Sequence, residues 1–204
     1  MNFQAENRSS GITALSAGPA STASTLFQSA GIVLTGSALV AVCAHLSVPL
    51  WFTPVPITLQ PFAVLLLGLL LGPRLVAATM VAYLVEGASG LPVFTPSGPG
   101  GLLQLFGFTG GYLLSYPIVT PLISVLWRHG ARSFTRGIVI AGAGSLVTLG
   151  MGAIWLGFVT HATPITVINH AVLPFLPGDA LKVVAVAGIA AGLSRFRRQD
   201  SYSS

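Results

Sequence analysis

Apolar residues run through this chain in long stretches that charged residues almost never interrupt. No Asp, Glu, Lys or Arg stands within residues 9–73, 75–85, 87–127 or 137–178. A helix needs about 20 mostly apolar residues to cross a bilayer, whereas a strand of an outer-membrane barrel would alternate apolar and polar residues. Because these stretches are apolar all round, we expect an all-α integral membrane protein.

Polar, glycine and proline residues divide the apolar pattern into six expected spans. Gly72 and Pro73 mark one turn, and further breaks fall in the loops 91–101, 128–136 and 161–172. The expected transmembrane helices cover residues 30–48, 58–72, 74–90, 102–127, 137–160 and 173–194.

The two ends of the chain differ from this six-helix transmembrane domain at residues 30–195. Residues 1–29 are rich in Ser, Ala and Thr and carry only Glu6 and Arg8 as charges. They contain no apolar core of the kind found in signal peptides. We therefore expect 1–29 to be a flexible cytoplasmic N-terminal tail and 196–204 to be a cytoplasmic C-terminal tail.

The arginines orient the expected helices. With six spans, every arginine falls on one side of the membrane, and the opposite loops 49–57, 91–101 and 161–172 contain no Lys or Arg. Positively charged loops stay in the cytoplasm. We therefore expect a multi-pass protein of the cytoplasmic (inner) membrane, with both termini in the cytoplasm and the lipid bilayer around it.

The composition argues against a soluble domain, a nucleic-acid-binding protein and a metal-binding protein. Only 6% of the residues are Asp, Glu, Lys or Arg, against about 25% in soluble domains. The net charge of +5 does not indicate nucleic-acid binding, because the basic residues are scattered at the ends of spans. The single cysteine, Cys43, lies in a span, and no Cys/His spacing predicts a metal site.

An acid and a base stand three residues apart in the last span, at Asp179 and Lys182. This spacing puts both on one face of a helix. Charges at membrane depth are costly and usually mark a pathway or a binding site. A structural role is the alternative, because Asp179 follows Pro177 and Gly178 as a helix N-cap would, and Lys182 could extend to the interface.

Other polar residues fall at the same expected depth. Glu86, near the outer end of the third span, could contact a ligand or form a salt bridge with Lys182 that only joins helices. Gln60 ends the proline-rich segment 47–61, which has no charge. An apolar pocket with a few polar groups is the usual form of a small-molecule site, and these outer segments could form its walls.

The stretch GFTGGYL places Gly107, Gly110 and Gly111 inside the fourth span. Glycine there permits close helix packing or close approach of the backbone to a ligand. The sequence has no GxxxxGK[ST], HExxH or GxSxG motif. We therefore expect that the protein is not an enzyme and that it has no ATPase motif of its own.

Four motifs in order resemble the BioY family, the biotin-specific substrate-binding S-components of energy-coupling-factor (ECF) transporters. They are VPITLQPFAVLLLGLLLGPRLVAA (55–78), GLPVF (90–94), GFTGGYL (107–113) and LPFLPGDALK (173–182). The resemblance implies a six-helix bundle that captures biotin from outside with high affinity. It also implies a transmembrane T-component and two ABC ATPases as partners. Biotin would be the transported ligand, and no cofactor is expected.

The resemblance also implies roles for individual residues. Asp179 and Lys182 would contact biotin, the TGGY motif would lie near the pocket, and the GLPVF loop would cover it. This chain departs from the family pattern at Phe108, where proline is usual, and at the loop TPSGPGG (95–101), which is usually a glycine run. The expected substrate-binding residues are Gln60, Glu86, Phe94, Thr109, Gly110, Tyr112, Asp179 and Lys182.

The first helix would supply the surface that docks on the T-component. Ser37 and Ala41 fit a small-xxx-small pattern, although His45 follows at the next position. The preferred function is biotin uptake, in which Asp179 accepts from a urea N–H and Lys182 donates to the urea oxygen. The alternatives are an S-component for riboflavin or thiamine, and a membrane scaffold subunit whose charges only pair helices.

Overall fold

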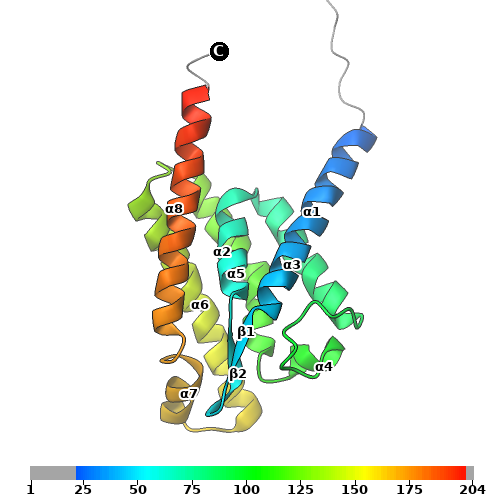
Figure 1. Ribbon diagram of the computed structural model, residues 1–204, viewed down its shortest axis with the longest axis vertical. Helices are drawn as coiled ribbons and strands as arrows, with labels where there is room; N and C mark the ends of the chain where they lie inside the picture. The colour runs from blue at the N-terminus through cyan, green and yellow to red at the C-terminus, as the bar shows by residue number, and fades with distance from the viewer. Residues whose placement is uncertain (1–21, 201–204) are drawn as a thin grey trace, which may run out of the picture.

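The computed structural model describes residues 22–200, and it describes the side chains of residues 24–196. The fold is mostly helical, with one small β-hairpin near the start (Figure 1). Its elements in chain order are α1 (Thr22–His45), β1 (Ser47–Leu50), β2 (Thr53–Thr58), α2 (Gln60–Leu70), α3 (Pro73–Ala88), α4 (Gly101–Phe106), α5 (Gly110–Arg128), α6 (Phe134–Thr160), α7 (Pro164–Ala171) and α8 (Leu176–Asp200).

The first and last helices of the chain extend past the predicted spans. Helix α1 begins at Thr22 instead of residue 30, so residues 22–29 of the predicted tail are helical, while 1–21 lie outside the described residues. Helix α8 continues to Asp200, beyond the predicted end at residue 194. Hydropathy marks the apolar part of a helix, whereas backbone hydrogen bonds continue into its polar ends.

The segment after α1 corrects the all-α prediction. Strands β1 and β2 pair antiparallel, with Ser47 opposite Thr58 and Leu50 opposite Thr53. Pro49 lies where the register shifts, between Val48 and Leu50. Proline cannot donate to a β-ladder and is confined to edges and irregular positions. The prolines therefore hid this two-stranded hairpin from the sequence pattern.

The predicted fourth span is divided in two. Helix α4 ends at Phe106, and α5 begins at Gly110 after a short break. The predicted outer loop 161–172 contains the short helix α7, which begins with Pro164. Proline suits the first turn of a helix, because its missing N–H would have no partner there. Both departures place extra backbone at the hairpin end of the molecule (Figure 1).

Four of the described helices are long and apolar enough to cross a membrane. These segments are Ser24–His45, Gly110–Arg128, Phe134–Thr160 and Leu176–Phe196. Helices α2 and α3, with 11 and 16 residues, are shorter than the roughly 20 residues of a full span. The segments expected to form six spans therefore contain four helices of spanning length and two short helices.

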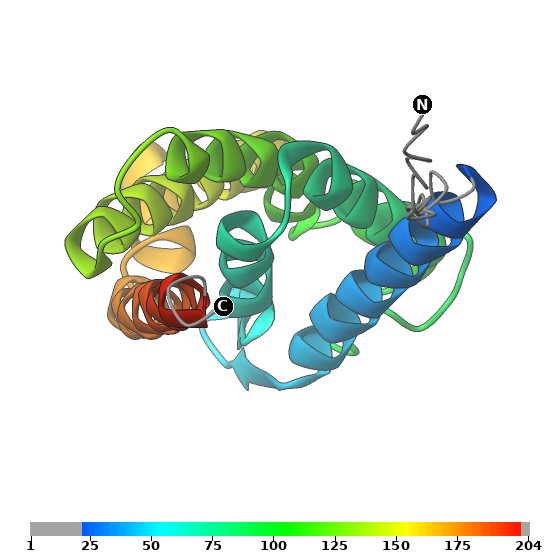
Figure 2. The same cartoon turned by 90° about the horizontal axis from the view of Figure 1, so that it is seen from above.

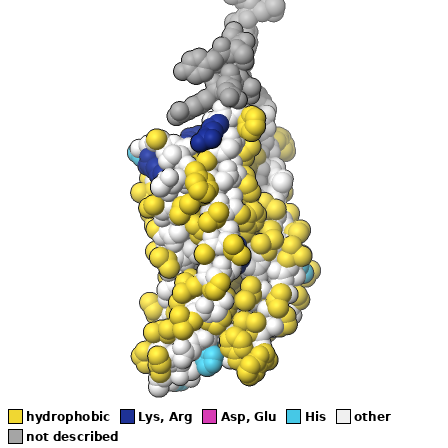
Figure 3. All heavy atoms as spheres, turned by 60° about the vertical axis from the view of Figure 1, so that its left-hand side comes forward, with side chains coloured by type: hydrophobic (Ala, Val, Ile, Leu, Met, Phe, Trp, Pro, Cys, Tyr) yellow, Lys and Arg dark blue, Asp and Glu magenta, His cyan; other side chains and the backbone are white. Residues whose placement is uncertain are grey.

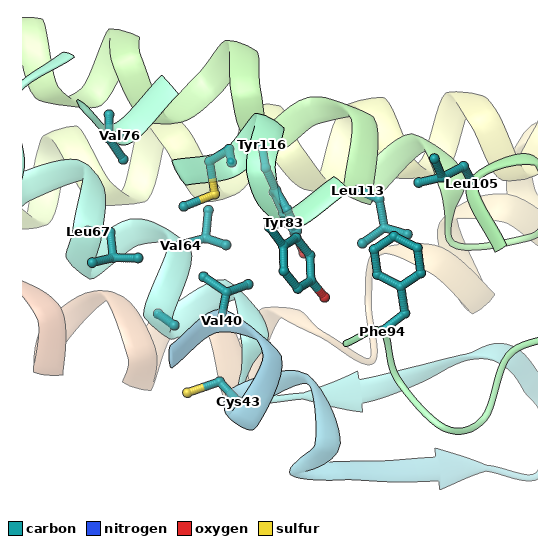
Figure 4. Packing of buried hydrophobic residues seen from close by; sticks show 12 residues of the cluster. Val40, Cys43, Val64, Leu67, Val76, Tyr83, Phe94, Leu105, Leu113 and Tyr116 are labelled. Carbon is teal, nitrogen blue, oxygen red and sulfur yellow. The ribbon is translucent and has the colours of Figure 1, made fainter. Parts of the chain in front are cut away.

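The helices form one bundle in which α2 occupies the middle (Figure 2). Helix α2 contacts α1, α5 and α8, while α5 packs on α3 and α6. One core cluster joins α1, α2, α3 and α5 and includes Val40, Val64 and Tyr83 (Figure 4). Large apolar side chains also cover the outside, including Phe158 and Leu181, which are 74% exposed (Figure 3). Such a surface suits lipid.

The two ends of the bundle differ in character. Both ends of the described chain lie together at one end, and the hairpin, α4 and α7 lie at the other (Figure 1). Basic side chains appear at the end where the termini lie (Figure 3). There, Arg132 and Arg195 line one surface depression. The bundle therefore has a basic end and a hairpin end.

Candidate ligand-binding site

A cavity lies at the hairpin end, between β2, α2, α4, α5, α6 and α8. The empty space inside it, counted together with its open mouth, is about 550 Å³. The lining is mostly apolar with a few polar groups. It comprises Val55, Pro56, Thr58, Gln60, Pro61, Thr95, Gln104, Thr109, Tyr112, Leu113, Tyr116, Thr148, Leu149, Phe175, Asp179 and Lys182.

Asp179 and Lys182 form an ion pair on the cavity wall. Lys182 Nζ lies 2.9 Å from Asp179 Oδ1, and the two side chains are only 11% and 9% exposed. Asp179 N–H donates to Phe175 O at 2.9 Å, so this residue lies inside the first turn of α8 and is not its N-cap, and its side chain lines the cavity. The geometry therefore disagrees with the capping and snorkelling alternatives.

The second carboxylate oxygen of Asp179 has a partner on another helix. Ser145 Oγ, on α6, donates to Asp179 Oδ2 at 3.1 Å. A buried charge is stable only when it is paired and hydrogen-bonded. Asp179 therefore has one oxygen held by Lys182 and the other by Ser145, which fixes the orientation of the carboxylate toward the cavity.

Gln60 connects the cavity to the loop between α3 and α4. Its Nε2 donates to Tyr83 Oη at 3.1 Å, and Tyr83 Oη donates to Val93 O at 3.0 Å. Phe94 stands edge-on to Tyr83, with ring centroids 5.4 Å apart (Figure 4). Gln60 lines the cavity, whereas Phe94 does not line it and packs in the hydrophobic core. Phe94 therefore anchors the loop instead of lining the cavity.

The break between α4 and α5 contributes Thr109 to the lining, and the first turn of α5 contributes Tyr112. Tyr112 Oη also donates to Ala171 O at 2.8 Å, which ties α5 to α7. Gly110 does not line the cavity, and a Cβ there would overlap Leu105 O. Trp155 packs over this break, and its Nε1 donates to Gly107 O at 2.8 Å. The glycine cluster therefore serves close packing.

Glu86 lies outside the cavity lining. Ser37 Oγ donates to its carboxylate, which joins α1 to α3. Among the side chains of residues 24–196, the only salt bridge is the one between Lys182 and Asp179. The structure therefore does not bring Glu86 to Lys182 or to the pocket that it was expected to line.

The expected docking surface on α1 needs a correction. Ser37 is completely buried, because it faces Glu86 on α3, and Ala41 packs partly buried against the core. The exposed face of α1 instead carries Gly31 and Thr35. The small-residue spacing identified a packing face of the helix, but packing within the chain occupies it.

Several lining residues were not expected from the sequence. Strand β2, in the segment 47–61 that was expected to form part of the wall, brings Val55 and Thr58. The unexpected residues are Thr95 and Gln104, from the loop and α4, and Thr148, from α6. Gln104 is an amide in an apolar stretch and 1% exposed, a polar signal of the kind that singled out Gln60. The hydroxyl residues had no such signal, since Ser and Thr are common in membrane helices.

Together these features define a helical protein with a lipid-compatible surface and a small-molecule cavity at one end. Residues 16–199 match the model of the BioY family. The chain belongs to the BioY family, and its four long apolar helices make it a membrane protein.

Two relatives and one solved structure place the chain more closely. It is 37% identical to the probable biotin transporter BioY of Pyrococcus horikoshii, over 75% of this chain and 88% of the relative. It is 35% identical to the biotin transporter BioY of Thermotoga maritima, over 78% and 91% of the two chains. It also resembles the crystal structure of the S-component for biotin from an ECF-type ABC transporter, with a TM-score of 0.76, 27% identity, and coverage of 86% and 95%.

Proposed function

We propose that this protein captures biotin and carries it across the cytoplasmic membrane as the S-component of an ECF transporter. The observation that carries the proposal is the buried Asp179–Lys182 pair on the wall of the cavity. Membership of the BioY family and the printed descriptions of the relatives support biotin as the ligand. The protein is a transport component and not an enzyme.

The paired charges suit the cyclic urea of biotin. A urea presents N–H donors beside a carbonyl acceptor, so Asp179 can accept from N–H while Lys182 donates to the oxygen. Hydrogen bonds to charged partners are the stronger ones, and a dry cavity strengthens them. Val55, Leu149 and Phe175 line the same cavity and would contact the apolar ring system and chain. Biotin is the cargo in this proposal, and no cofactor takes part.

The proposal includes six membrane crossings, by α1, α2, α3, α5, α6 and α8, with both termini in the cytoplasm. The position of both chain ends at the basic end supports it (Figure 1), because an even number of crossings returns the chain to its starting side. A short helix such as α2 is accommodated by local thinning of the bilayer. The multi-pass location in the inner membrane follows from the same orientation, since basic ends stay in the cytoplasm.

An S-component requires partners to supply energy, here a transmembrane T-component and two ABC ATPases. The similar crystal structure comes from an ECF-type ABC transporter, which supports this assembly. A groove lies between the exposed face of α1 and the side chains of Leu67 and Leu71, at the end of α2. This surface, instead of the buried Ser37, would receive the T-component.

Calorimetric titration of the purified protein tests the ligand. The detergent-solubilised protein, stripped of endogenous ligand, is titrated with biotin, and with riboflavin and thiamine as controls. We expect tight one-to-one binding of biotin alone. A folded protein that binds riboflavin or thiamine instead would move the function to another vitamin, and one that binds none of the three would favour a scaffold role.

A further inference from the structure

One hydroxyl group in the cavity wall has no hydrogen-bond partner. Thr95 is 6% exposed, and it lines the same cavity as Asp179 and Lys182. Among the side chains of residues 24–196, its Oγ1 is the only buried side-chain nitrogen or oxygen atom without a partner. Buried polar groups are normally hydrogen-bonded, so each exception needs an explanation.

The loop around Thr95 is held in place by its own hydrogen bonds. Thr95 O accepts from Gly98 N and from Gln104 Nε2, both at 3.3 Å. Gln104 Oε1 in turn accepts from Gly100 N at 3.1 Å. Phe94, the residue before Thr95, is buried against Tyr83 (Figure 4). The backbone therefore presents Thr95 to the cavity from a fixed position.

Close packing prevents larger residues from replacing the small ones in this loop. A Cβ at Gly98 would overlap the side-chain amide of Gln104, and Gly100 has a φ of +71°, which favours glycine. Gln104 is itself 1% exposed and lines the cavity. Gln104 Nε2 donates one of its two N–H groups to Thr95 O, so the second N–H is left as a further donor. The loop therefore places two neutral donors, Thr95 and Gln104, at one part of the wall.

The charged pair lies elsewhere on the wall. Asp179 and Lys182 belong to the start of α8, and the ribbon places α8 and the loop 89–100 on opposite sides of the bundle (Figures 1 and 2). Of the carboxylates on residues 24–196, Glu86 and Asp179, only Asp179 lines the cavity. The part formed by the loop is therefore neutral and rich in donors, which suits an anionic acceptor.

We propose that Thr95 Oγ1 donates a hydrogen bond to the carboxylate tail of the bound ligand, with Gln104 beside it. This inference rests on the proposed function, because it takes the ligand to be biotin with its urea at Asp179 and Lys182. It also removes an electrostatic conflict, since the tail would lie away from the ionised Asp179. The unpaired hydroxyl then gains its partner when the ligand binds.

The test compares two ligands and three variants in the full-length protein. Thr95→Val removes the hydroxyl and keeps the shape, Thr95→Ser keeps the hydroxyl, and Thr79→Val removes a buried hydroxyl of α3 that lies outside the cavity lining. The ligands are biotin and an analogue whose tail ends in a methyl group instead of the carboxylate. Titration calorimetry gives each affinity, and thermal melting of the ligand-free protein reports on folding.

We expect Thr95→Val to weaken biotin binding about tenfold and to leave binding of the methyl analogue unchanged. Thr95→Ser and Thr79→Val should bind biotin as the wild type does. The melting temperature of ligand-free Thr95→Val should equal or exceed that of the wild type, because an unpaired polar group has been removed from the interior.

Two results would overturn the assignment of Thr95 and leave the proposed function standing. One is wild-type affinity for biotin in Thr95→Val, and the other is an equal loss for both ligands with a lower melting temperature, which would mean that Thr95 only holds the loop. A folded wild-type protein that binds no biotin would overturn the proposed function first, and this assignment of the tail with it.

Discussion

Ser145 on α6 donates a hydrogen bond to the Asp179 carboxylate on α8 across 3.1 Å. Lys182 holds the other oxygen of the same carboxylate at 2.9 Å. The acid therefore joins two helices while it faces the cavity. The orientation of its carboxylate therefore depends partly on a residue 34 positions earlier in the chain.

Removing Ser145 should therefore weaken the binding of biotin without unfolding the bundle. In Ser145→Ala, one oxygen of Asp179 loses its donor, and the carboxylate is less well oriented toward the ligand. We expect a loss of affinity of about tenfold or more, because a hydrogen bond to a charged group contributes about 1.5–3 kcal/mol. Calorimetry measures the loss. The control Ser194→Ala, at the basic end of α8, should bind normally, and equal losses in both variants would contradict the role of Ser145.

Replacing Lys182 should affect both binding and stability. Lys182→Met leaves the Asp179 charge buried and unpaired, which costs about 3–5 kcal/mol of stability. We expect the affinity for biotin to fall at least tenfold, about 1.4 kcal/mol, together with a lower melting temperature. The exposed Arg195→Met is the control and should change neither quantity.

The double variant Asp179→Asn with Lys182→Met separates these two effects. Both charges are removed together, so no buried charge is left alone, and the melting temperature should recover toward the wild-type value. Biotin binding should stay weak, because neither charged partner of the urea is present. Recovered binding in a stable double variant would show that the pair serves the fold and not the ligand.

The contact between Ser37 and Glu86 should matter for stability and not for biotin affinity. Ser37→Ala leaves the Glu86 carboxylate without its donor between α1 and α3, which costs about 1–3 kcal/mol. We expect a lower melting temperature, with biotin affinity within about twofold of the wild type. Thr35→Ala, on the exposed face of the same helix, should leave the melting temperature unchanged. A large loss of affinity in Ser37→Ala would place Glu86 back in the site.

Gly110, the first residue of α5, should tolerate no side chain. In Gly110→Ala the new Cβ would overlap Leu105 O, and overpacking of this kind costs about 1–3 kcal/mol or more. Gly150→Ala on α6 is the matched control, because nothing lies within 4 Å of a Cβ there. We expect thermal melting to show a clear loss for Gly110→Ala and no loss, or a small gain, for Gly150→Ala.

Labelling from outside the cell tests the proposed six crossings. In a Cys43→Ala background, Trp51→Cys at the hairpin tip should react with a membrane-impermeant maleimide in whole cells. Ser133→Cys, in the loop between α5 and α6, should react only after the membrane is opened. Reaction of both from the same side would contradict the proposed orientation.

Some errors of the sequence interpretation have a common cause. Residues 49–57 were expected to be an outer loop between two spans, and they form most of a hairpin that supplies Val55 to the cavity. Ser37 fitted a docking pattern by its spacing, but the structure buries it against Glu86. A spacing pattern shows which side chains share a face of a helix, and it does not show which neighbouring helix covers that face.

The amino-acid sequence by itself determined the membrane class, the helical fold and the position of Asp179 and Lys182 on one face of a helix. These properties are local, because the length of an apolar stretch and a spacing of three residues need no knowledge of other segments. Only the tertiary structure decided that Ser145 holds Asp179, that Glu86 lies away from the pair, and that Thr95 stands unpaired in the cavity wall. Each of these depends on which distant segments pack together, since a buried polar group takes its partner from whatever side chain the fold brings within reach.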